Sequence, residues 1–111
     1  MPTSQVSRRT FQIREYHRLS VHCLMYFSAG DVHGTGTVWN VSLGGWRVDS
    51  EVPLECGTML KVCVMLPDCE QTIVVDQARV SWSRGHEFGL AIVHIQPRDA
   101  AYLRAFIIGH V

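Results

Sequence analysis

Apolar residues recur at every second position in several stretches of this chain. The clearest stretch is Leu19–Phe27, in which every odd-numbered residue is apolar. A period of two is typical of a β-strand with one face buried. Further strand-like stretches, separated by short turn-forming segments, are Val32–Val41, Trp46–Ser50, Thr58–Leu66, Gln71–Ser83 and Phe88–Ile95. Six strands with short connections and no helix between them predict an all-β, antiparallel sheet closed into a barrel.

The period changes after Ile95. Pro97 suits the first position of a helix, and Asp99 favours the positive end of the helix dipole. Apolar residues then follow at helical spacing, and Gly109 is a natural stop; they are Tyr102, Leu103, Phe106 and Ile107. The pattern therefore predicts a C-terminal α-helix that packs over one opening of the barrel.

Irregular positions are expected inside two of the strands. Gly34 and Gly36 predict a bulge or a point of close contact. The segment Asp76-Gln77 interrupts the apolar pattern of its strand and predicts a bulge there.

The composition bounds the class of protein. With 111 residues the chain is large enough for one core but not two, and its ten basic and ten acidic side chains balance. No run of about 18 apolar residues occurs, so no membrane span is expected. The first residues lack the apolar centre of a secretion signal, which predicts a cytoplasmic location.

The four cysteines show no metal-ligand spacing. Cys23, Cys56, Cys63 and Cys69 form no CxxC pair and no paired Cys/His motif. We therefore expect no metal site and reduced thiols, with Cys23 and Cys63 as small core residues on strands.

The segment Asn40-Val41-Ser42-Leu43-Gly44-Gly45 must turn the chain between two predicted strands. Asn and Ser side chains bond to nearby backbone amides, and paired glycines allow positive φ and close approach of another group. A turn of this chemistry can hold a polar, anionic ligand. A bare connecting turn is the alternative.

A pair of arginines, Arg14 and Arg18, precedes the first predicted strand. Each guanidinium group suits phosphate oxygens or the edge of a guanine, and its flat face can stack on a base. With these two motifs the chain resembles the PilZ domain family, the bacterial receptors for cyclic di-GMP. Arg14 and Arg18 match the family's RxxxR motif, and Asn40, Ser42 and Gly45 match its [D/N]xSxxG turn.

The resemblance extends beyond the motifs. Val80-Ser81-Trp82 followed by Glu87-Phe88-Gly89-Leu90 is similar to the late strand pair of the family, so the likeness runs from about Arg8 to Ile107. It implies a six-stranded antiparallel PilZ-type β-barrel with a C-terminal α-helix. Residues 1–13 would be a flexible N-terminal arm, and residues 14–111 a single PilZ domain.

The resemblance also implies the ligand, cyclic di-GMP. Arg14 and Arg18 would meet its guanine edges and phosphates. Two neighbours depart from the family pattern: Glu15 adds a negative charge where the family often has further arginine, and the apolar Ile13 favours one bound ligand over a stacked pair.

The turn residues have implied roles as well. Asn40 would contact a guanine edge, and Ser42 would either bond a phosphate or fix the turn. Gly45 would keep the backbone clear of the ligand, and Gly44 would help to shape the turn.

Signalling would follow from ordering of the arm. An arm that folds onto the barrel changes the surface offered to an effector protein, which the sequence does not name. The alternative is a PilZ-like protein-interaction module with weak or no nucleotide binding.

Two other classes of protein are less consistent with the residues. Ser42 departs from the nucleophile elbow at the first glycine of that motif, and no acid or base is marked by its context, so no catalysis and no cofactor are expected. Trp39, Trp46 and Tyr26 could stack the bases of a nucleic acid polymer, but the basic stripe of such surfaces is missing.

Overall fold

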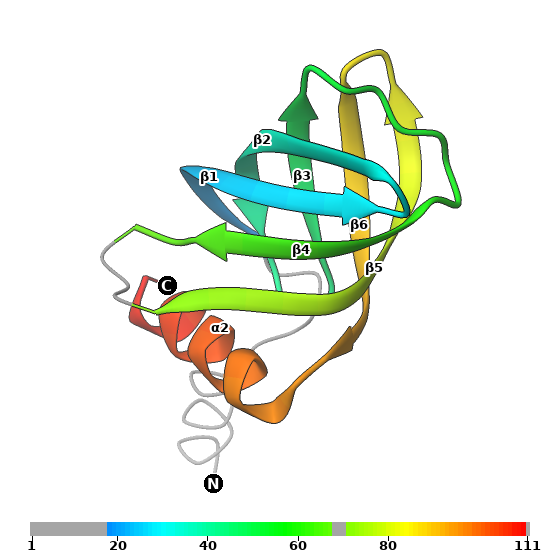
Figure 1. The fold of residues 1–111 in the computed structure, drawn as a ribbon. Coiled ribbons are helices and arrows are strands. Elements are labelled where there is room, and N and C mark those ends of the chain that lie inside the picture. The colour runs from blue at the N-terminus through cyan, green and yellow to red at the C-terminus, as the bar shows by residue number, and fades with distance from the viewer. Residues whose placement is uncertain (1–17, 68–70, 111) are drawn as a thin grey trace, which may run out of the picture.

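The computed structural model describes residues 18–67 and 71–110. The predicted arm, Arg14 and Cys69 lie outside these ranges. The described elements are β1 (Leu19–Ala29), β2 (Val32–Val41), β3 (Gly45–Ser50), β4 (Met59–Met65), β5 (Thr72–Arg84), β6 (Glu87–Ile95) and helix α2 (Pro97–Gly109). The strands are antiparallel and close in the order β1-β2-β3-β6-β5-β4 (Figure 1). The predicted barrel and terminal helix are confirmed.

The alternating residues of the strands fill the barrel. Met25 and Phe27 of β1 are buried while their neighbours point outward, as the period of two predicts. Phe27 meets Phe88 of β6 edge to face, with ring centroids 6.2 Å apart. The core therefore joins strands that lie far apart in the sequence.

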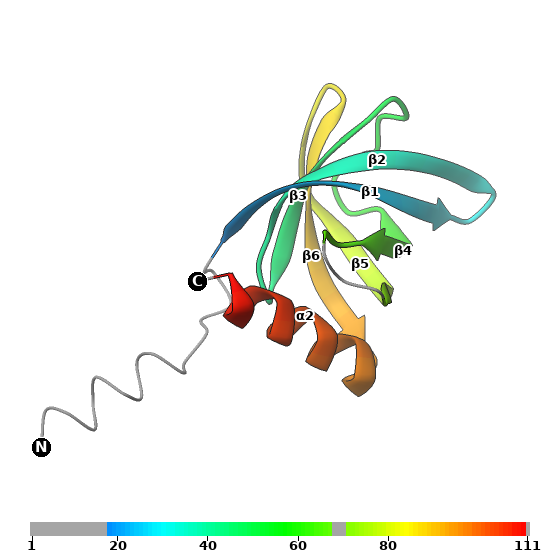
Figure 2. The same ribbon diagram turned by 90° about the vertical axis from the view of Figure 1, so that its left-hand side faces the viewer.

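Helix α2 lies at one end of the barrel, as Figures 1 and 2 show. Its buried residues are the apolar Leu103, Phe106 and Ile107, together with Asp99. Asp99 does more than complement the helix dipole, because its Oδ1 accepts a hydrogen bond of 3.0 Å from the backbone N–H of Val74 in β5. The helix is therefore tied to the strand that it covers.

The irregular positions predicted inside the strands are confirmed. A Cβ on Gly36 would lie 2.8 Å from the carbonyl oxygen of Asp49, and one on Gly34 would lie 2.5 Å from the Phe27 ring. The register of β5 against β6 shifts on both sides of Gln77, which is the predicted bulge.

The cysteines occupy two different environments. Cys23 packs against the core, and burial raises the pKa of its thiol to about 11, so this thiol stays protonated at neutral pH. The expectation that Cys63 is a core residue is wrong, because β4 buries Leu60, Val62 and Val64 and turns Cys63 to the outer face. Within residues 18–67 and 71–110, no group of three or more His, Cys, Asp or Glu residues is placed to hold a metal ion.

The described ranges contain no helix with the length and apolar character that crossing a membrane requires.

Candidate functional site

Three residues connect β2 and β3. Strand β2 ends at Val41, as predicted, and β3 begins at Gly45, one residue before the predicted start. The Ser42 hydroxyl donates to the carbonyl oxygen of Gly45 at 2.8 Å and accepts from the Gly45 N–H at 3.0 Å. The Ser42 N–H bonds to the same carbonyl at 3.0 Å. Ser42 is 1 % exposed, so its side chain closes the turn from inside.

The two glycines of the turn serve strand pairing. A Cβ on Gly45 would lie 2.5 Å from the carbonyl oxygen of Leu90 in β6, and the carbonyl of Gly44 accepts a hydrogen bond of 2.9 Å from the Ile92 N–H. Of the two properties that paired glycines allow, Gly45 shows the close approach, and neither glycine has a positive φ. Among the described residues, the positive-φ glycines lie in other connections: Gly30, Gly57 and Gly85.

Alanine at position 45 is therefore expected to lower the free energy of unfolding by about 1–3 kcal/mol, because the obstructing atom belongs to the backbone of β6. The matched control is Gly89→Ala, whose Cβ would meet the Trp82 indole at 2.1 Å. That indole is 39 % exposed and can rotate away, so the control should lose less. Urea unfolding of both variants measures the difference, and equal losses would contradict the assignment.

A first hollow on the barrel surface contains Arg18 and three of the turn residues. Its volume is about 460 Å³, and its lining consists of Arg18, Ser42, Gly44, Gly45, Ser81, Leu90, Ala91 and Ile92. Arg18 is exposed and directly precedes Leu19, which pairs with Val41 at the end of β2. Strand pairing therefore holds Arg18 beside the turn, as the motif spacing predicts.

A second hollow contains Asn40. The register of β2 against β3 shifts between Val38 and Asn40, so Trp39 and Asn40 are successive residues that lie outside the core. This hollow measures about 540 Å³ and is lined by Ser20, Val21, His22, Trp39, Asn40 and Arg47. The His22 ring stacks on Trp39, with centroids 4.6 Å apart and planes at 21°.

The two hollows are neighbours because β2 and β3 connect them. Asn40 pairs with Arg47, and Val41 pairs with Trp46 one residue closer to the turn. Arg18, Ser42, Gly44 and Gly45 thus share the first hollow, and Asn40 lines the second; Arg14 lies outside the described residues. Each volume falls in the range of about 300–1,000 Å³ that small-molecule sites occupy.

Two residues in or beside these hollows were not among the predicted site residues. Arg47 follows Gly45 by two positions on a strand that alternates buried and exposed residues, so the alternation was a usable signal. Trp82 pairs with Gly89 and lies against it, a contact that only the long-range register of β5 and β6 establishes.

The proposed base-stacking set is wrong for one of its members. Trp46 is 2 % exposed and its ring belongs to the core, so it offers no surface to a base. Tyr26 pairs with Cys63 of β4, away from Trp39 of β2. The three aromatic residues therefore do not form one platform.

An open barrel surface with an exposed arginine, a buried serine turn and an amide is a candidate ligand site. Comparison with known proteins agrees: the family model described as PilZ domain matches residues 12–109. The chain belongs to the PilZ domain family, which is a family of cyclic di-GMP receptors. PilZ domains are binding and adaptor modules rather than enzymes.

Solved structures share the fold. The PilZ domain of CeSA from a cellulose-synthesizing bacterium is 15% identical, with a TM-score of 0.66, and the match covers 84% of this chain and 96% of that one. The Bacillus subtilis inhibitor of motility, MotI/DgrA, is 21% identical with a TM-score of 0.69; the match covers 88% of this chain and 51% of that one. No curated protein matches the sequence.

Proposed function

We propose that this protein is a receptor that binds cyclic di-GMP on the outer surface of β2, β3 and β6 and passes the signal to an effector protein. The observation that carries the proposal is the position of Arg18 beside the Ser42 turn, with Asn40 in the neighbouring hollow. Membership of the PilZ family supports the choice of ligand.

The arginines supply the contacts to the ligand's charge and bases. Arg18 is exposed in the first hollow, and its guanidinium group can bond two phosphate oxygens or the O6 and N7 atoms of guanine. Arg14 is proposed as its partner from the sequence motif alone. Charge-assisted hydrogen bonds contribute about 1.5–3 kcal/mol each, and ordering a segment on binding costs about 2–5 kcal/mol. This balance permits a dissociation constant in the micromolar range or below.

The turn residues have more definite roles than the motif alone gives them. The Ser42 hydroxyl already donates to Gly45, so we assign it to fixing the turn rather than to a phosphate. Gly45 is assigned to the close pairing with Leu90. Asn40 is half-buried on β2 and is the amide proposed to contact a guanine edge.

Calorimetric titration with cyclic di-GMP tests the proposal. We expect binding at micromolar concentration or below, and much weaker binding of cyclic di-AMP, whose bases lack the O6 acceptor. Asn40→Ala should weaken binding by about tenfold, whereas Gln77→Ala, an exposed amide that lines neither hollow, should not. No heat of binding at concentrations far above micromolar would refute the proposal.

Signalling is proposed to involve the segment before the barrel. Residues 1–13 precede Arg14 and Arg18, so a ligand held by both arginines brings this segment to the barrel surface. We propose that its conformation changes on binding and that an effector protein detects the change. Hydrogen exchange across residues 5–20, with and without cyclic di-GMP, measures this; unchanged protection would contradict it.

A protein-interaction module with weak or no nucleotide binding is the second candidate. The specific support is the fold similarity to a protein described as an inhibitor of motility. Both proposed functions use the same barrel, and the titration with cyclic di-GMP distinguishes them. Only a receptor shows saturable binding that depends on Asn40.

A further inference from the structure

Arg47 stands in a row of residues that crosses five strands on the outside of the barrel. Asn40 of β2 pairs with Arg47 of β3, Arg47 pairs with Gly89 of β6, and Gly89 pairs with Trp82 of β5. Ser20 of β1 pairs with Asn40 at the other end. Residues directly opposite on neighbouring strands have Cβ atoms about 4.5–5.5 Å apart, so a base that reaches Asn40 also reaches Arg47.

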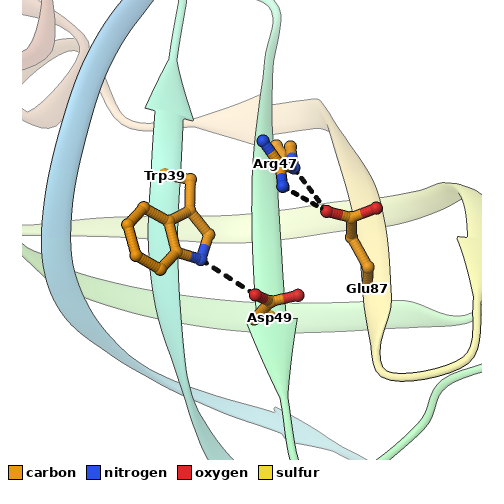
Figure 3. A network of polar contacts seen from close by, with 4 residues as sticks. All are labelled: Trp39, Arg47, Asp49 and Glu87. Carbon is orange, nitrogen blue, oxygen red and sulfur yellow. Dashed lines mark hydrogen bonds and ion pairs between the residues drawn. The ribbon is translucent and has the colours of Figure 1, made fainter.

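The guanidinium group of Arg47 forms an ion pair with one carboxylate, that of Glu87. Its Nε donates to Oε2 of Glu87 at 2.6 Å, and its Nη2 pairs with the same oxygen (Figure 3). The side chains of Arg47 and Glu87 are 44% and 25% exposed. An ion pair open to water to this degree is weak, so a ligand with good acceptors can compete with Glu87 for the arginine.

In the strand register, Glu87 lies between Asp49 of β3 and Arg84 of β5. Asp49 of β3 lies directly opposite Glu87 of β6, and like charges in that arrangement repel. Arg47 pairs with Glu87, while the Trp39 indole N–H donates to Oδ2 of Asp49 at 3.0 Å (Figure 3). Each carboxylate is thus satisfied by a different residue of the second hollow, Arg47 or Trp39.

We propose that Arg47 is a specificity-determining contact for guanine, and that Glu87 holds it in the ligand-free protein and competes with the base. This rests on the proposed function. Arg47 and Asn40 contact two edges of the same guanine. Arg47 bonds the O6 and N7 atoms, because a guanidinium fork matches those two acceptors. Adenine presents an amino group in place of O6, which repels the arginine's donors.

The test is a double-mutant cycle measured by calorimetry with cyclic di-GMP and cyclic di-AMP. Arg47→Ala should weaken cyclic di-GMP binding by about tenfold or more and reduce the preference over cyclic di-AMP. Glu87→Ala releases Arg47 and should strengthen binding by about two- to fivefold. Combined with Arg47→Ala it should add nothing, since no arginine remains to be released.

The signs of the changes separate this role from two others. If Arg47 only supports the strands, both single variants break the same ion pair and both weaken binding. If Glu87 only repels an anionic ligand, the gain from Glu87→Ala persists in the double variant. Either result overturns the proposal, as does a wild-type protein that binds while Arg47→Ala binds equally well. A wild-type protein that binds neither ligand refutes the receptor function itself.

Discussion

Replacing Trp46 by alanine is expected to lower the free energy of unfolding by about 3–5 kcal/mol. The side chain is 2 % exposed and belongs to the core cluster. Its indole N–H donates to the carbonyl oxygen of Ser42 at 3.2 Å, so it connects the core to the turn. A domain of this kind has a total stability of about 5–15 kcal/mol, and the substitution therefore removes a large part of it.

Two controls separate the contributions to this loss. Trp46→Phe keeps a ring in the core but loses the hydrogen bond, which should cost about 0.5–1.5 kcal/mol for the bond alone. Trp82→Ala removes the same indole from an exposed position and should cost less than Trp46→Ala. Urea unfolding with tryptophan-independent detection, such as far-ultraviolet circular dichroism, measures all three. Equal losses at positions 46 and 82 would contradict the assigned burial.

Removal of both motif arginines is expected to weaken cyclic di-GMP binding by about a hundredfold or more. Each charge-assisted contact contributes about 1.5–3 kcal/mol, so Arg14→Ala or Arg18→Ala alone should cost about tenfold or more. Lysine at position 18 should not restore the affinity, because an ammonium group lacks the planar fork. Calorimetry measures each dissociation constant.

The matched control for these variants is Arg98→Ala, which removes an exposed arginine in the first turn of α2. It lines neither hollow, so its binding should equal that of the wild type. Thermal unfolding should be unchanged for Arg18→Ala, since Arg18 is exposed and precedes the first strand. Full affinity in Arg14→Ala or Arg18→Ala would refute the roles assigned to the pair.

The fold was predictable because its signals are local. Alternation of apolar residues gives each strand its inner face, and Pro97 together with the later helical spacing gives α2. The order of closure was not predictable, because the pairing of β3 with β6 and of β1 with β4 depends on the packing of the whole barrel.

The sequence motifs named the candidate site residues, but the arrangement of these residues needed the structure. The motif spacing identified Arg18 and the turn, and these residues do share one hollow. The bulge at Trp39 determines where Asn40 lies, and only the register of β2 against β3 establishes it. The reason for glycine at position 45 is the Leu90 carbonyl, which lies 45 residues further along the chain.

Closure of the barrel restricts how any effector protein can recognise this domain. Among the described residues each strand has a paired neighbour on both sides, so a partner could extend the sheet through its main chain only at short unpaired stretches, such as residues 19–24 of β1 on the side of β4. Side chains offer a larger surface, because Leu24, Tyr26 and Met65 are exposed apolar residues on β1 and β4, outside both hollows. A partner bound to this apolar surface and a nucleotide bound on β2 and β3 would therefore not overlap.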